Sequence, residues 1–117
     1  MKVYILEDSA DLGQLLCEFL KMEKGADCAS ATSFAQLLKD PEPALSADLV
    51  VLDVNLGTDQ PSGIDAYEWL RDQGYRGRVI FLTGHGAGHP LVKKARALSG
   101  VPVLEKPVEA ERLLELL

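Results

Sequence analysis

The chain has 117 residues and a formal net charge of −6, with 12 Lys and Arg against 18 Asp and Glu, and 47% of its residues are hydrophobic. This length predicts one domain, and the hydrophobic content excludes a fully disordered chain. The acidic balance argues against direct binding of nucleic acid or of an anionic membrane surface, and no apolar run is long enough to span a bilayer.

The two cysteines, Cys17 and Cys28, are too few to form a disulfide framework. The helical pattern around Cys17 shows no disulfide partner for it, so we expect ordinary thiols, which suit a reducing cytoplasm. The chain enters a strand-like run directly, and we therefore expect no signal peptide.

Short apolar runs and amphipathic segments alternate along the chain. Runs that are apolar at every position are typical of strands covered on both faces, and leucines repeating every three or four residues predict helices. In chain order, the sequence predicts a strand at 3–6, a helix at 9–20, a weak strand at 26–30, a helix at 33–39, a strand at 49–52, a helix from 62 to about 70, a strand at 79–82, a helix from 90 to about 98, a strand at 101–104 and a helix at 109–117.

Particular side chains indicate where several helices begin and end. Ser9 has the hydroxyl typical of an N-cap, and Ser62 with Asp65 resembles a capping box. Pro41 and Pro43 should end the helix before them, because proline cannot continue a helix interior.

Five consecutive strand–helix units predict an α/β fold, namely a doubly wound, five-stranded parallel sheet with helices on both faces. Right-handed crossovers reduce the topology to a few such sheets. In these sheets ligands bind outside the carboxyl ends of the strands. Residues that follow the strands are therefore the first candidates for function.

Charged and polar side chains follow four of the five predicted strands. They are Glu7, Asp8, Asp53, Thr83 and Lys106. Crowded carboxylates disfavour one another's ionisation, and Mg²⁺ relieves this because it binds carboxylate oxygens together with phosphate oxygens and water. Asp53 ends the most apolar strand and is the candidate nucleophile that would form an aspartyl phosphate. The Thr83 hydroxyl and the Lys106 ammonium would hold the other phosphoryl oxygens.

This arrangement resembles the receiver domain of bacterial two-component response regulators. The matching motifs are Glu7-Asp8, Asp53-x-Asn55, Thr83-Gly84 and Lys106-Pro107. Each motif is weak alone, but four in this order, each closing a strand, are specific together. The resemblance covers residues 1–117 and implies one receiver domain with the flavodoxin-like (βα)5 fold.

The resemblance also implies site residues and a function. It implies that Glu7, Asp8, Asp53 and the backbone carbonyl of Asn55 bind Mg²⁺ or Mn²⁺. Asp53 would accept a phosphoryl group from the phosphohistidine of a sensor histidine kinase or a histidine phosphotransfer protein. The domain would then switch its binding to a downstream protein or to a second copy of itself. It would catalyse only its own phosphorylation and dephosphorylation, in the cytoplasm, and would not be an enzyme acting on an outside substrate.

Three positions depart from the usual pattern of that family. Receivers usually carry Tyr or Phe three residues before the lysine, as a rotamer switch, whereas this chain has Val103. The family commonly has a glycine eight residues after the acceptor aspartate, whereas Gly63 follows Asp53 by ten. The loop over residues 57–62 is therefore about two residues longer than usual, which would change kinase docking or the lifetime of the phosphate. His85 either orients a water near the phosphoryl group or is an ordinary solvated loop residue.

Two other functions remain as alternatives. A phosphohydrolase of the haloacid dehalogenase type would also use Asp53 as a nucleophile beside Mg²⁺. That family needs a second aspartate two residues later as a general acid, and Asn55 cannot serve as one. A receiver-like fold that binds partners without phosphorylation is the third hypothesis, and the intact set of acids argues against it.

Overall fold

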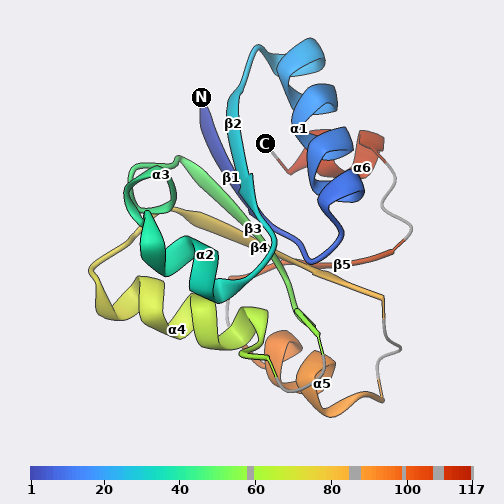
Figure 1. The fold of residues 1–117 in the computed structure, drawn as a ribbon. Helices are drawn as coiled ribbons and strands as arrows, with labels where there is room; N and C mark the ends of the chain where they lie inside the picture. Colours follow the sequence, from blue (N-terminus) through green and yellow to red (C-terminus); the bar gives the residue numbers. More distant parts are fainter. Residues whose placement is uncertain (58–59, 85–87, 99, 107–109, 117) are drawn as a thin grey trace.

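One five-stranded sheet forms the centre of the computed structural model, which describes residues 1–57, 60–84, 88–98, 100–106 and 110–116. All four neighbouring strand pairs are parallel, and the strand order is β2-β1-β3-β4-β5 (Figure 1). The strands are β1 (Lys2–Leu6), β2 (Asp27–Ala31), β3 (Leu49–Asp53), β4 (Arg78–Thr83) and β5 (Val103–Glu105).

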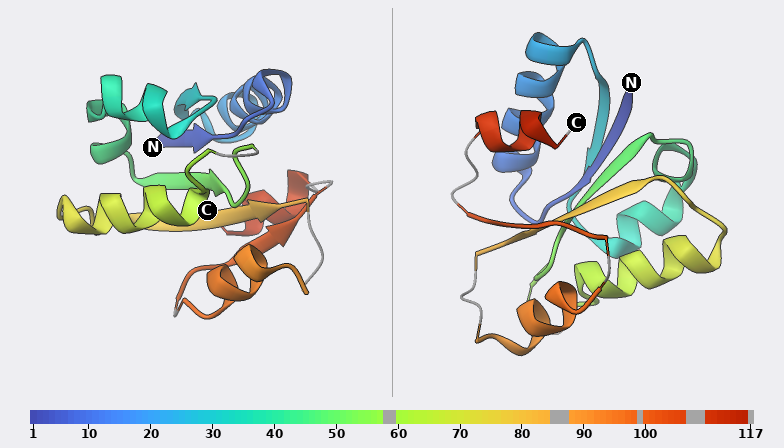
Figure 2. Two further views of the ribbon diagram at one scale, coloured as in Figure 1. Left: turned by 60° about the horizontal axis from the view of Figure 1, so that its bottom comes forward. Right: turned by 180° about the vertical axis from the view of Figure 1, so that it is seen from behind.

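Helices cover both faces of this sheet. Helices α1 and α6 lie on one face, and α2, α4 and α5 lie on the other (Figures 1 and 2). The predicted doubly wound α/β fold is therefore confirmed. The helices are α1 (Ala10–Lys24), α2 (Phe34–Lys39), α3 (Glu42–Leu45), α4 (Gly63–Asp72), α5 (Pro90–Arg96) and α6 (Ala110–Glu115). Among the described residues, none of these helices has both the length and the apolar character needed to cross a membrane.

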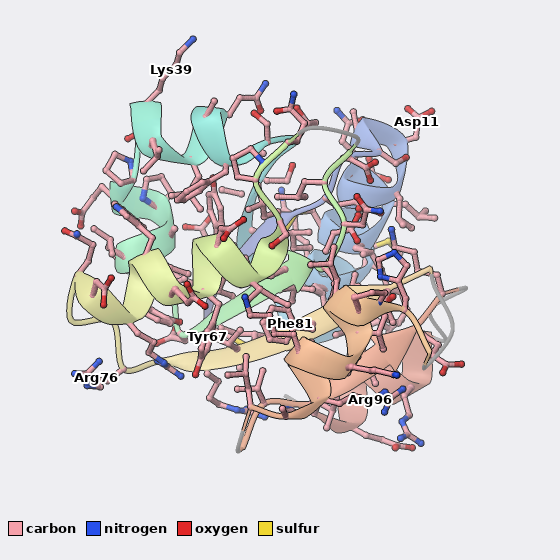
Figure 3. All side chains as sticks on the ribbon, turned by 90° about the horizontal axis from the view of Figure 1, so that it is seen from below. Asp11, Lys39, Tyr67, Arg76, Phe81 and Arg96 are labelled. Carbon is pink, nitrogen blue, oxygen red and sulfur yellow. A yellow bond between two sulfur atoms is a disulfide. The ribbon has the colours of Figure 1, made fainter. Side chains whose placement is uncertain are left out.

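Alternating side chains of the strands build one apolar layer on each face. Ile5 and Val51 pack with Leu16 of α1 on one side, whereas Leu52 and Phe81 belong to the layer on the other side. Every residue of β3 is buried, which explains why this strand is apolar along its whole length until Asp53. On the second face, the Tyr67 ring of α4 packs against Phe81 at 5.7 Å between ring centroids (Figure 3).

The capping signals in the sequence are confirmed. The Ser9 hydroxyl accepts a hydrogen bond from the backbone N–H of Leu12 at 3.2 Å and caps α1. Ser62 and Asp65 form a complete capping box at the start of α4. Helix α2 ends at Lys39 as expected, but the sequence analysis missed the short helix α3 that follows. Pro41 is the N-cap residue of α3, and Pro43 lies in its first turn.

The cysteines do not have the form that the sequence predicted. Cys17 of α1 and Cys28 of β2 form a disulfide, with Cα atoms 5.4 Å apart, so the expectation of two free thiols is wrong. The chain reverses direction at Gly25, whose φ of 64° ends α1, and β2 then runs back beside the helix. Periodicity predicts each element separately, and it gives no sign that these two side chains face each other.

Candidate functional site

The carboxyl ends of β1 and β3 place three acids at one edge of the sheet. Leu6 pairs with Leu52, so the residues that follow β1 lie level with the end of β3. Glu7, Asp8 and Asp53 each offer a carboxylate oxygen, and these atoms lie within 4.8 Å of one another. Glu7 and Asp53 are only 1% and 2% exposed, whereas Asp8 is exposed to solvent. The structure therefore brings together the three acids that the sequence analysis singled out.

Lys106 joins this cluster from the end of β5. Its ammonium donates to Glu7 Oε1 at 2.5 Å and to Asp53 Oδ2 at 3.1 Å. Its backbone N–H donates to the carbonyl of Thr83 at 2.7 Å, which fixes the end of β5 beside the end of β4. One ammonium thus faces three carboxylates, and the site keeps an excess of negative charge.

Thr83 and Asn55 lie next to the acids in different ways. Thr83 is the last residue of β4 and is 1% exposed. Asp53 pairs with Leu82, so Thr83 lies one register position beyond Asp53. The backbone N–H of Asn55 donates to Asp53 Oδ1 at 3.2 Å, and the Asn55 side chain accepts from the N–H of Gly57 at 3.0 Å. Asn55 therefore orients the Asp53 carboxylate and also shapes the loop that follows.

Gly63 has a role at the site that the sequence analysis missed. A Cβ atom at this position would lie 2.1 Å from the carbonyl oxygen of Asp53. The backbone N–H of Gly63 donates to the carbonyl of Val54 at 3.0 Å. Only glycine allows the start of α4 to pack this closely on the end of β3. The sequence analysis noted the spacing of Gly63 from Asp53 and its place directly after Ser62 in the capping box, but neither signal shows this close packing.

Burial and crowding change the protonation of the site. Burial raises the pKa of Asp53 to about 9, and the neighbouring Glu7 and Asp8 add to this effect, while Lys106 opposes it. Burial also acts to raise the pKa of Asp8, but hydrogen bonds to Asp53 and Glu7 outweigh it and the pKa is lowered. Burial lowers the pKa of Lys106, yet its two acidic partners raise it on balance, so the ammonium stays charged.

The donor set fits a hard divalent cation. Glu7 Oε2 is buried and has no hydrogen-bond partner among the described residues. An unsatisfied buried carboxylate oxygen is costly unless a cation or a water binds it. Carboxylate oxygens at this spacing are the ligands that Mg²⁺ and Mn²⁺ prefer. The residues present are therefore suited to such an ion.

The positions that depart from the receiver pattern are only partly described. Val103 is half-buried in β5, where it lies in register with Phe81 of β4. His85, whose role was left open, and Pro107 of the matching motif lie outside the described residues, as do residues 58–59 of the loop after Asp53. In the described part of that loop, Gly57 has a φ of 124°, a backbone conformation that favours glycine.

The sequence is similar to known signalling proteins. A family model described as the response regulator receiver domain matches residues 3–117. The transcriptional regulatory protein FixJ of Bradyrhizobium diazoefficiens is 33% identical over 112 residues, which cover 95% of this chain and 52% of that protein. The chain thus spans about half the length of this relative.

Solved structures have the same architecture. A response regulator receiver domain protein from Clostridium thermocellum has a TM-score of 0.77 and 26% identity, covering 95% of this chain and 86% of that one. The chemotaxis protein CheY4 of Vibrio cholerae has a TM-score of 0.78 and 23% identity, covering 97% and 92% of the two chains, and supports the fold alone.

Proposed function

This chain belongs to the family of response regulator receiver domains, and from that premise we propose that Asp53 is its phosphoacceptor and that residues 1–117 act as one such domain. The observation that carries the proposal is the convergence of Glu7, Asp8 and Lys106 on Asp53 at the carboxyl edge of the sheet. The family match does not support the alternative of a haloacid dehalogenase-type phosphohydrolase.

Each side chain has a separate part in the proposed reaction. Glu7, Asp8 and Asp53, with the backbone carbonyl of Asn55, would hold Mg²⁺ or Mn²⁺, which supplies positive charge opposite the phosphoryl oxygens. Lys106 adds a second positive charge, and its contacts with Glu7 and Asp53 keep it at the acceptor. Thr83 places a hydroxyl at the neighbouring strand end.

The transfer step is a displacement at phosphorus. A carboxylate oxygen of Asp53 attacks the phosphoryl group of a phosphohistidine, an O–P bond forms and the N–P bond breaks, and the imidazole leaves. Hydrolysis later returns the carboxylate and inorganic phosphate. The domain therefore catalyses only its own phosphorylation and dephosphorylation.

The proposed partners follow from this chemistry. A sensor histidine kinase or a histidine phosphotransfer protein supplies the phosphoryl group in the cytoplasm, and a downstream protein or a second copy of the chain responds to it. FixJ is described as a transcriptional regulatory protein. Because this chain spans about half of FixJ, an output of that kind would need segments beyond the receiver domain.

Intact mass spectrometry tests the proposed acceptor. Wild-type protein incubated with acetyl phosphate and Mg²⁺ should gain the mass of one phosphoryl group, and Asp53→Asn should gain none. Asp72→Asn is the matched control, because Asp72 is an exposed acid at the end of α4, and it should be labelled like the wild type. Equal labelling of Asp53→Asn and the wild type would contradict the assignment.

A further inference from the structure

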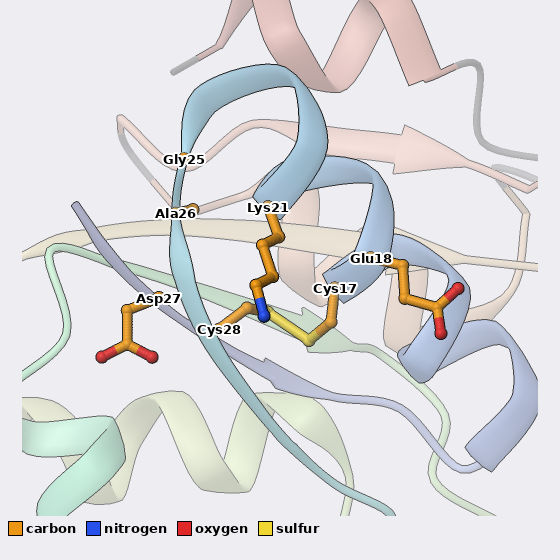
Figure 4. Close-up of a pocket in the computed structure, with 7 residues that line it drawn as sticks. All are labelled: Cys17, Glu18, Lys21, Gly25, Ala26, Asp27 and Cys28. Atoms are coloured by element: carbon orange, nitrogen blue, oxygen red, sulfur yellow. A yellow bond between two sulfur atoms is a disulfide. The ribbon is translucent and has the colours of Figure 1, made fainter.

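The Cys17–Cys28 disulfide lies away from the acidic site, between α1 and the edge strand β2. Both cysteines are half-buried, so part of each reaches the surface. A surface cavity of about 480 Å³ lies against the pair (Figure 4). The sulfur atoms are therefore placed where a small molecule can approach them.

Charged side chains line this cavity together with the cysteines. Lys21 follows Cys17 by four residues and so shares its face of α1, and its side chain extends toward the disulfide in Figure 4. An ammonium beside a thiol stabilises the thiolate, which is the nucleophile in disulfide exchange. Glu18 and Asp27 add two carboxylates to the rim. A small thiol that carries both amino and carboxylate groups finds complementary charges here.

We propose that Cys17 and Cys28 form a reversible exchange site for low-molecular-weight thiols and disulfides of the glutathione class. One cysteine thiolate attacks glutathione disulfide, and a mixed disulfide and one glutathione thiolate result. The second cysteine then attacks the mixed disulfide, which closes the protein disulfide and releases the second glutathione. Two protein thiols are oxidised and one glutathione disulfide is reduced to two thiols, so electrons and protons balance.

We expect the chain to fold in both redox states. The cysteines only border the apolar layer, whose buried members on α1 are Leu16 and Leu20. Helix α1 also has its own cap at each end, Ser9 and Gly25. Reduction should therefore loosen the attachment of α1 to β2 without unfolding the sheet.

The helix and strand that the disulfide joins, α1 and β2, also lie against Glu7 of the proposed phosphoacceptor site. Gly13 lies one turn before Cys17, and a Cβ built on it would be 3.7 Å from Ser30 Cβ and 3.9 Å from Glu7 Cβ. The backbone N–H of Glu7 also donates to the carbonyl of Ala31 in β2 at 3.0 Å. The disulfide thus fixes the same helix and strand that position Glu7. We expect reduction to weaken Mg²⁺ binding, a consequence that rests on the proposed function.

Alkylation across a series of glutathione ratios tests the exchange site. The full chain is equilibrated in mixtures of glutathione and glutathione disulfide and treated with iodoacetamide. Intact mass spectrometry then counts the alkyl groups added to each chain. Two alkyl groups should be added in the reducing mixtures and none in the oxidising mixtures. The fraction of protein that carries two alkyl groups should change reversibly when the protein is moved between reducing and oxidising mixtures. Two added groups at every ratio, or none at every ratio, would overturn the proposal.

Calorimetric Mg²⁺ titrations test the coupling to the acidic site. Reduced wild type should bind Mg²⁺ about fivefold more weakly than oxidised wild type. The Cys17→Ser/Cys28→Ser variant is the control and should bind equally in both buffers. Equal affinities in the two wild-type states would overturn the coupling. Absence of Mg²⁺ binding in both states would contradict the proposed function and the coupling, while normal alkylation would still support the exchange site.

Discussion

Lys106 and Glu7 are 99 residues apart in the chain, yet the Lys106 ammonium lies 2.5 Å from a Glu7 carboxylate oxygen that is fully buried. The same ammonium contacts Asp53 at 3.1 Å. This lysine therefore ties the end of β5 to the ends of β1 and β3, across the width of the proposed site. Removing it would leave the buried Glu7 carboxylate without its cation and Asp53 without this hydrogen bond.

Lys106→Met should destabilise the metal-free protein. The lysine side chain is 23% exposed, so solvent reduces the effect, and we expect a loss of about 2 kcal/mol in the free energy of unfolding. Urea denaturation measures it. Lys94→Met, at an exposed position of α5, is the control and should change stability by less than about 0.5 kcal/mol. Equal stability of both variants would mean that the buried contacts contribute nothing.

The raised pKa of Asp53 predicts how stability depends on pH. Between its ordinary value of 3.8 and about 9, the folded protein binds a proton at Asp53 that the unfolded chain has lost. Stability of the metal-free protein should therefore fall as pH rises through this window. Mg²⁺ binds the deprotonated carboxylate, so it should stabilise the fold and reduce this fall.

Thermal melts from pH 5 to 9, with and without Mg²⁺, measure both effects. Asp53→Asn cannot titrate at this position and should lose much of the pH dependence together with the Mg²⁺ effect. The interpretation fails if Mg²⁺ leaves the melting temperature of the wild type unchanged at every pH.

Gly63→Ala should directly disturb the end of β3, which carries the proposed acceptor Asp53. Its Cβ would lie 2.1 Å from the carbonyl oxygen of Asp53, so backbone must move, at a cost of about 1–3 kcal/mol. Labelling by acetyl phosphate should also become slower, because Asp53 is displaced. Gly88→Ala is the matched control, since no atom lies within 4 Å of its built Cβ. Identical stability and labelling of the two variants would contradict this account of Gly63.

The disulfide should contribute measurably to stability. Cys17 and Cys28 are 11 residues apart, and closing a loop of this length stabilises a fold by roughly 3 kcal/mol. We therefore expect the oxidised protein to melt about 10 °C above the reduced protein. The Cys17→Ser/Cys28→Ser variant should have the same melting temperature in oxidising and in reducing buffer. Coincident melts of oxidised and reduced wild type would show that the disulfide does not restrain the unfolded chain.

The fold and the set of acids could be predicted because both follow from local patterns and one general rule. The uninterrupted apolar character of β3 indicates a central strand, and the parallel topology then places Asp53 on the same edge as Glu7 and Asp8. The rest depends on contacts between elements. No periodicity shows that Cys17 faces Cys28, or that Gly63 must allow an approach to the Asp53 carbonyl. The two contacts of Lys106 likewise exist only once the strands are assembled.

Identifying the phosphorylated residue is the most direct test of the proposed phosphoacceptor. Protein labelled with acetyl phosphate and Mg²⁺ is reduced with borohydride, which converts an aspartyl phosphate to homoserine, and is then digested and sequenced by tandem mass spectrometry. We predict homoserine at position 53 and at no other acid of the chain. Homoserine at another aspartate, with Asp53 unchanged, would contradict the proposed site.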